Sequence, residues 1–201
     1  MHVTGLWQRS VLRRAALRYA EQGWRVIPGA ALMNDRYVCG PLCPTVAVHP
    51  AVDQWELAAS SEWSDVDGWW RNSPYSVLLA TGATFDVIEV SARVGAAAVQ
   101  RVRTVPVAVD PVGRWMFLVA SGATLDPDLS ASHATVLHGA GSWIPAPPTR
   151  TPGGRIRWEV DPAEVGWHLP DARVLQQVLA APTRLSGDTF GPTARQLRTA
   201  A

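Results

Sequence analysis

The sequence contains no lysine. All 18 of its basic residues are arginine, and 17 acidic residues leave a formal net charge of +1. Without a lysine amine, Schiff-base chemistry and a phosphate-binding P-loop are excluded. The near-neutral charge excludes a histone-like polycation and provides only weak long-range attraction to phosphates. An arginine-only composition indicates a GC-rich genome and by itself points to no function.

Cysteine is also scarce, since Cys39 and Cys43 are the two thiols of the chain and are too few for a disulfide framework. No apolar run approaches the roughly 18–20 residues that cross a bilayer, and the N-terminal segment lacks the apolar centre of a secretory signal. With 47% hydrophobic residues the chain can still bury a core, so disorder is excluded. We therefore expect a cytoplasmic protein without a membrane partner.

Helical and strand periodicities are interleaved along the chain. Apolar residues at three- and four-residue steps predict a helix over 6–22, which Gly23 would end, and a strand over 24–28. Residues 29–54 are interpreted as a long irregular loop. The other helices expected are 64–71, with Ser64 as N-cap, 94–103 and 170–181; the other strands expected are 76–82, 85–91, 105–109, 114–121, a hairpin of 134–139 with 142–147, and a last strand ending at 160.

These elements predict a single domain over residues 1–185 and a polar tail over 186–201. Helices are interleaved with strands in the first half, and strands cluster in the second. That order indicates an α+β domain with mixed sheets, a helix near each end, and no doubly wound sheet.

Three metal-ligand side chains lie close together within the loop. Cys39, Cys43 and His49 fall within 11 residues and offer two thiols and an imidazole. Structural zinc sites take four such ligands in a tetrahedron, so this is an incomplete zinc site that His2, Asp35 or water would complete. The alternative is that both thiols are reduced and buried without a metal.

Four segments carry a family resemblance, and together they cover most of residues 10–180: ALRYAEQGWRVIP, CGPLCPTVAVHP, SVLLATGATFDVIEVSARVG and WIPAPPTRTPGGRIRWEV. In this order they resemble the N-terminal domain of bifunctional DNA primase/polymerases, a member of the archaeo-eukaryotic primase superfamily that is common in actinobacteria, their plasmids and phages. The resemblance implies the primase–polymerase fold. It also implies nucleotidyl transfer, in which carboxylates hold divalent metals and a histidine contacts the nucleotide phosphates.

The family's functional positions are degenerate in this chain. Where the family pattern has two strand aspartates, this chain has Glu89 and Ser91. The position of the phosphate-contacting histidine carries Trp115, and that of a third acid falls near Val136. The arginine that follows this acid in the family becomes His138. Magnesium and manganese are therefore not expected as cofactors.

Other roles remain open for the charged residues. Glu89 is either a relic of the metal site or a strand-end residue paired with Arg93 or Arg114. Asp86 and Asp110 are the acids that would serve if the metal ligands had moved. Arg114, Arg155 and Arg157, with Arg150, are candidates for binding a nucleotide or phosphate, although arginines on turns also form ordinary solvated surfaces.

Three functions follow as hypotheses. The first is a pseudoenzyme of the primase–polymerase class that acts as a binding or accessory protein in DNA replication or regulation. Here a protein partner is favoured over nucleic acid or nucleotide, because the net charge is small. The second is an active enzyme with relocated metal ligands. The third is an unrelated α+β interaction domain.

The first two hypotheses make a spatial prediction. Glu89, Ser91, Trp115 and Val136 should converge in one cleft, as the family's site residues would. Because tryptophan replaces a polar ligand, the cleft should be apolar, with Arg114 at its mouth and Arg155 or Arg157 nearby.

Overall fold

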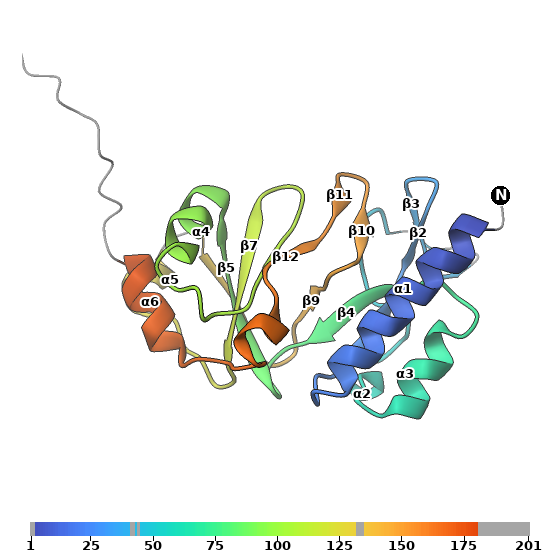
Figure 1. Ribbon diagram of the computed structural model, residues 1–201, viewed down its shortest axis with the longest axis horizontal. Helices are drawn as coiled ribbons and strands as arrows, with labels where there is room; N and C mark the ends of the chain where they lie inside the picture. Colours follow the sequence, from blue (N-terminus) through green and yellow to red (C-terminus); the bar gives the residue numbers. More distant parts are fainter. Residues whose placement is uncertain (1–2, 41–42, 44, 132–134, 181–201) are drawn as a thin grey trace, which may run out of the picture.

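The computed structural model describes residues 3–40, 43, 45–131 and 135–180. Two main sheets lie next to each other, and helices pack against both of them (Figure 1). Every strand pair in the described part of the chain is antiparallel, so neither sheet mixes strand directions. The predicted α+β class is confirmed.

The smaller sheet has the order β1-β4-β9 and is covered by two helices. Its strands are β1 (Val26–Gly29), β4 (Ser76–Ala80) and β9 (Trp143–Pro145). The helices are α1 (Val3–Ala20) and α3 (Trp63–Trp70), and the short α2 (Trp55–Ala58) precedes α3. Gly23 has a φ of 73°, as expected for the residue that closes the turn after α1.

The larger sheet has the order β12-β6-β7-β5-β8. Its strands are β5 (Phe85–Ser91), β6 (Val107–Val109), β7 (Arg114–Ala120), β8 (Thr135–His138) and β12 (Arg157–Val160). Two helices, α4 (Ala92–Val99) and α6 (Ala172–Ala180), pack on its outer face, and the short elements α5 (Pro127–Ser130) and η1 (Pro162–Val165) lie in its connections.

One apolar cluster joins the two sheets, and it fixes which face of the larger sheet points inward. Alternate residues of β5 and β7, such as Val87 and Met116, pack in the same cluster as Leu12 of α1 and Leu79 of β4. The intervening residues, such as Ile88, pack with α4 and α6 on the outer face. This alternation decides the location of every polar side chain on β5 and β7.

The predicted hairpin of 134–139 with 142–147 is wrong. β8 pairs with β5 in the larger sheet, whereas β9 pairs with β4 in the smaller sheet. Gly141, with a φ of 75°, lies in the connection between them. Glycines between two strand patterns favour a turn, but here the turn carries the chain from one sheet to the other.

The loop predicted over 29–54 contains a hairpin that the sequence analysis missed. β2 (Ala31–Met33) pairs with β3 (Arg36–Val38) across Asn34 and Asp35, whose φ values are 49° and 59°. Two adjacent residues with positive φ are typical of a two-residue hairpin turn, and asparagine and aspartate tolerate this conformation. The Asn-Asp pair was therefore the available signal.

Smaller differences concern helix ends. Ser64 lies inside α3, and Glu62 is the N-cap, so the predicted cap is wrong. Helix α4 starts at Ala92, directly after β5, rather than at residue 94. The predicted tail over 186–201 lies outside the described residues. Among the described helices, none combines the length and apolar character that a membrane span requires.

Candidate functional site

Glu89 lies on the inner face of β5, between strands β7 and β8. It pairs with Met116 on one side and with Val136 on the other. Side chains of directly paired residues share a face, so Glu89 and Val136 point toward the smaller sheet, and Ser91 does too because it lies two residues along β5. The structure thus brings three of the four predicted positions onto one face.

The carboxylate of Glu89 is already bound by two side chains of the protein. His138 Nε2 lies 3.1 Å from Glu89 Oε2, and Arg114 Nη1 lies 3.5 Å from Glu89 Oε1. The Glu89 side chain is only 13% exposed, which strengthens both interactions relative to those of a surface pair. His138 also contacts the Ser142 hydroxyl through Nδ1 at 3.1 Å, so each of its ring nitrogens has a partner.

Arg114 connects Glu89 to a second acid, Asp110. The Arg114 side chain donates from Nε to Asp110 Oδ2 at 2.7 Å, and its backbone N–H donates to Asp110 Oδ1 at 2.9 Å. Burial by itself lowers the pKa of Arg114, but the hydrogen bond to Asp110 and the negative charge of Glu89 outweigh it, so the pKa is raised. A permanent cation therefore lies between the two carboxylates.

The two other inward-facing positions carry no charge. Ser91 ends β5 and is the N-cap of α4, where its side chain makes no capping hydrogen bond. Val136 is exposed on β8, which is the edge strand of the sheet. Neither side chain can replace a carboxylate ligand of a divalent metal.

Trp115 does not belong to this site, so the predicted convergence is wrong for it. Trp115 pairs with Val90 and therefore points to the outer face, where it packs against Gly95 of α4. The fit is close, because a Cβ added to Gly95 would lie 2.3 Å from Trp115 Cγ. With an exposure of 8%, Trp115 is buried against α4. The expected tryptophan-lined cleft behind Arg114 does not form from it.

The arginines predicted to bind a nucleotide or phosphate do not lie on one surface either. Arg157 pairs with Val109 in the sheet, which directs it to the outer face, and it forms an ion pair with Glu159. Arg155 lies on β11 (Gly154–Arg155), with its guanidinium over the ring of Trp7. Of the arginines proposed for phosphate binding, Arg114 is the one bonded to Glu89.

Asp86 can be excluded as a relocated ligand at this site. It pairs with Val119 on the outer face of β5 and is 2% exposed. Its Oδ2 accepts the backbone N–H of Ala123 at 2.7 Å, while its Oδ1 has no partner among the described residues. Strand alternation therefore separates Asp86 from Glu89, whereas Asp110 shares Arg114 with it.

A second candidate site lies in the loop after β3. The ligand atoms of Cys39, Cys43 and His49 all lie within 4.8 Å of one another, as the sequence predicts. Cys43 Sγ is 3.3 Å from His49 Nε2, which is close to the separation of about 3.5–3.8 Å that tetrahedral zinc bonds impose. His49 Nδ1 is 2.7 Å from the Ala47 carbonyl, which can only accept a hydrogen bond, so Nδ1 carries the proton and Nε2 has its lone pair free.

The two thiols of this loop differ in acidity. A hydrogen bond from Cys39 is the main cause that lowers the pKa of Cys43 to about 7, and the same bond raises the pKa of Cys39. The thiolate is the form that binds metals. Of the residues considered for a fourth ligand, Asp35 lines the neighbouring cavity with Cys43 but is not part of the cluster, and His2 lies outside the described residues.

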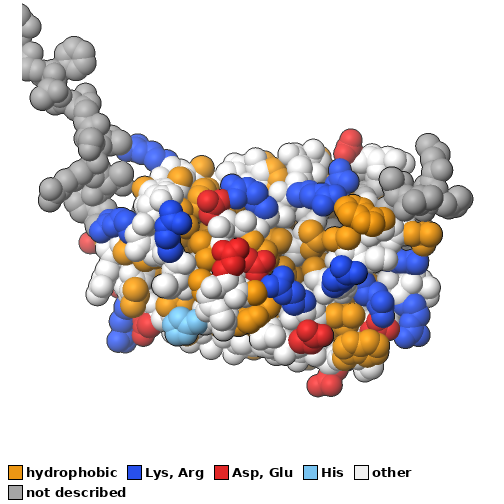
Figure 2. Space-filling model, viewed as in Figure 1, with side chains coloured by type: hydrophobic (Ala, Val, Ile, Leu, Met, Phe, Trp, Pro, Cys, Tyr) orange, Lys and Arg blue, Asp and Glu red, His pale blue; other side chains and the backbone are white. Residues whose placement is uncertain are grey.

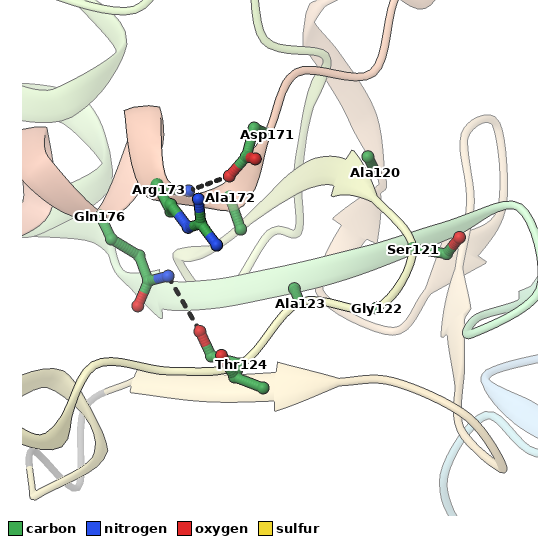
Figure 3. Close-up of a pocket in the computed structure, with 9 residues that line it drawn as sticks. All are labelled: Ala120, Ser121, Gly122, Ala123, Thr124, Asp171, Ala172, Arg173 and Gln176. Carbon is green, nitrogen blue, oxygen red and sulfur yellow. Dashed lines mark hydrogen bonds between the residues drawn. The ribbon is translucent and has the colours of Figure 1, made fainter.

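A further cavity lies between the turn after β7 and the start of α6 (Figure 3). The Gln176 side chain donates to the Thr124 carbonyl at 2.9 Å, and Asp171 accepts the Arg173 backbone N–H at 2.8 Å. The Gln176 bond connects the two walls of the cavity, whereas the Asp171 bond lies at the first turn of α6. Because these polar groups are bonded within the protein and none comes from a predicted site position, we assign the cavity no function.

Comparison with known proteins agrees with this architecture. Residues 16–172 match the family model described as the N-terminal domain of bifunctional DNA primase/polymerases. No curated protein matches the chain. The matched range is more than half of the sequence and contains both candidate sites, which excludes the hypothesis of an unrelated α+β domain. The chain belongs to the bifunctional DNA primase/polymerase N-terminal family.

Proposed function

We propose that this chain is a primase–polymerase domain that does not transfer nucleotides and instead acts as a binding protein in DNA replication or regulation. The observation that carries the proposal is the bonding of Glu89 to both Arg114 and His138. In a working site of this family, the corresponding carboxylates would bind divalent metals. Here the protein itself provides the cationic and hydrogen-bonding partners.

The residues around Glu89, here called the strand site, are Glu89, Ser91, Asp110, Arg114, Val136 and His138. They do not fit a pair of magnesium or manganese ions. Such ions need several carboxylate or other oxygen ligands that converge on them. On the inner face, Ser91 and Val136 are neutral at positions where the family has acids. The remaining acids, Glu89 and Asp110, share the guanidinium of Arg114. We therefore derive no metal-dependent step at this site.

One observation favours a second candidate function, an active enzyme with relocated ligands. Because Glu89 and Asp110 contact the same guanidinium, a movement of Arg114 would leave two carboxylates facing one space. A nucleotide triphosphate is an anion that would attract Arg114 in this way. The second function thus predicts activity that depends on both acids.

Primer extension distinguishes the two functions. The purified chain is incubated with a primed template, deoxynucleotides or ribonucleotides, and Mg²⁺ or Mn²⁺. We expect no extension product. Extension that is lost in Glu89→Ala and in Asp110→Ala, but kept in the exposed control Glu164→Ala, would replace the first function by the second.

The proposed ligand class follows from the family. Membership associates the chain with nucleic acid or nucleotides. The expectation of a protein partner is based on the net charge of +1, and no feature of the residues that the structure describes supports it. We therefore propose nucleic acid or nucleotide as the ligand, and a protein partner becomes an alternative outcome of the binding experiments.

The loop of residues 39–49, here called the thiol loop, has ligands that suit zinc. We propose that Cys39, Cys43 and His49 bind a zinc ion together with a fourth ligand from solvent or from outside the described residues. The metal would supply structural cross-linking, because it would tie residues 39–49 into one unit. The orientation of His49 by the Ala47 carbonyl supports this role.

A further inference from the structure

An exposed tryptophan lies at the edge of the smaller half of the molecule, on a surface that neither candidate site uses. Trp7 of α1 is 59% exposed. With Val11 and Leu12 of the same helix it lines a shallow apolar pocket, which Pro148, Arg150 and Arg155 complete from the other side. Arg150 and Arg155 come from the hairpin of β10 (Arg150–Thr151) and β11.

The two arginines of this hairpin form a cross-strand pair of like charge. Arg150 lies directly opposite Arg155 in the β10–β11 register, an arrangement that destabilises a hairpin in the absence of a counter-ion. Within the described part of the chain, neither guanidinium has a carboxylate at ion-pair distance, whereas Arg157 nearby pairs with Glu159. The hairpin therefore presents two uncompensated cations that favour an anion.

The indole is positioned beside these cations. Arg155 Cζ lies 5.7 Å from the centre of the Trp7 ring, so the aromatic surface and the guanidinium are parts of one patch. Figure 2 shows blue arginine and orange hydrophobic side chains next to each other over α1 and the β10–β11 hairpin. An aromatic face beside arginines combines a stacking surface with phosphate ligands.

The hairpin also connects this patch to the larger sheet. A Cβ added to Gly154 would lie 3.3 Å from Pro111 Cγ, so the tip of the hairpin packs on the turn that follows Asp110. A linear ligand that lies across Trp7 and the hairpin would therefore extend toward the strand site. An isolated small anion would use only part of this surface.

From these observations we infer that Trp7, Arg150 and Arg155 bind single-stranded nucleic acid, with one base stacked on Trp7 and the neighbouring phosphates on the two arginines. Stacking on an aromatic side chain beside a basic groove is the usual mode of sequence-independent binding to single strands. The arginine forks provide charge-assisted hydrogen bonds to phosphate. This inference rests on the proposed function, which names nucleic acid or nucleotide as the ligand, and adds the surface that binds it. It does not depend on whether the strand site is active.

The apolar part of the patch is bordered by unpaired cations, which favours a polyanion over an apolar protein surface. A folded partner would have to cover both guanidinium groups with its own carboxylates or leave them desolvated. A single strand provides a planar apolar group and a negative charge at every nucleotide. The composition of the patch is thus complementary to nucleic acid.

The test is the binding of a fluorescently labelled oligodeoxythymidine, measured by anisotropy in buffer without added divalent metal. We expect Trp7→Ala to weaken binding roughly fivefold to a hundredfold, and Trp7→Phe to retain most of it, since a phenyl ring still stacks. The double variant Arg150→Ala/Arg155→Ala should lower the slope of log affinity against log salt by about 1.4, because each phosphate contact to a single strand contributes about 0.7.

Two matched controls test the location. Trp63→Ala removes another tryptophan of similar exposure, 56%, from α3, and Arg157→Ala removes an exposed arginine that is already paired. Both should bind as the unmodified chain does. The inference would be overturned if the unmodified chain did not bind the oligonucleotide, or if the Trp7→Ala and double-arginine variants bound it as tightly as the unmodified chain does. It would also be overturned if an acidic peptide bound to this surface and the oligonucleotide did not compete with it. Primer extension reports on Glu89 independently, so failure of one proposal does not imply failure of the other.

Discussion

The thiol loop and the strand site differ in what their metal-ligand atoms face. In the loop, two sulfur atoms and an imidazole nitrogen with a free lone pair converge on one point. In the strand site, Arg114 and His138 direct nitrogen atoms at Glu89, and Arg114 also binds Asp110. The family resemblance implies a metal at both places, but only the loop offers unfilled donors. The comparison teaches that the retention of a fold and of one acid is no measure of the retention of a metal site.

The largest expected effect concerns zinc affinity in the loop. Cys43→Ser removes the more acidic thiol of the cluster. Loss of even an outer partner of a metal ligand weakens binding by about 10–100-fold, so we expect this loss of a direct ligand to weaken zinc binding by more than about a hundredfold. Competition with a chromophoric chelator measures the affinity. Thr45→Ala in the same loop is the control and should keep the affinity for zinc. Equal zinc affinities of Cys43→Ser and the unmodified chain would show that the loop does not bind zinc through Cys43.

The next effect concerns the strand site. Arg114→Ala leaves two largely buried carboxylates without their cation, and we expect the free energy of unfolding to fall by about 2–3 kcal/mol. Urea denaturation measures the change, and Mn²⁺ should restore part of the loss in this variant alone, because the freed acids then face one space. The exposed ion pair of Arg157 is the control, since Arg157→Ala should change the free energy by less than about 1 kcal/mol. An unchanged free energy of unfolding in Arg114→Ala would show that the guanidinium does not compensate the charges of Glu89 and Asp110.

The smallest effect concerns Asp67, an acid outside the strand site that also binds arginines, and it is compared with the pairing of Arg114. Asp67 of α3 accepts hydrogen bonds from Arg71 and Arg13, which lower its pKa from the ordinary value of 3.8. Because the folded-state pKa lies below the unfolded one, the stabilisation is present above about pH 4 and is lost as the pH falls through the folded pKa. Asp67→Asn should therefore destabilise the protein at pH 6, and this effect should diminish as the pH falls through the folded pKa. Urea titrations over this pH range measure the difference, and a difference independent of pH would contradict the ion-pair explanation.

Several local features were accessible from the sequence because their causes are local. Apolar continuity predicts β5 with the bounds 85–91, which are those in the structure. Cys39, Cys43 and His49 lie within 11 residues, so a short loop brings them together whatever surrounds it. The β2–β3 hairpin was also a local feature, and it was missed because Asn34 and Asp35 were not interpreted as a turn.

Features that depend on strand pairing were less accessible. The segments that form β8 and β9 have glycines between them and alternate like a hairpin, yet their partners lie in different sheets. The face of Trp115 follows from its pairing with Val90, and a shift of one residue would have reversed it. The sequence positions of these strands do not specify that register.

By itself, the sequence determined the α+β class, the family, the proximity of the thiol loop ligands, and the absence of acids at Ser91 and Val136, because each depends on residue identity or on neighbours along the chain. Only the tertiary structure decided that Arg114 lies between Glu89 and Asp110, and that the hairpin arginines lie beside the indole of α1. Asp110 is only four residues from Arg114, but the contacts of Arg114 with Glu89 and of the hairpin with α1 join segments far apart in the chain. Side-chain alternation and strand register determine them, and both arise from the packing of the two sheets around their common core.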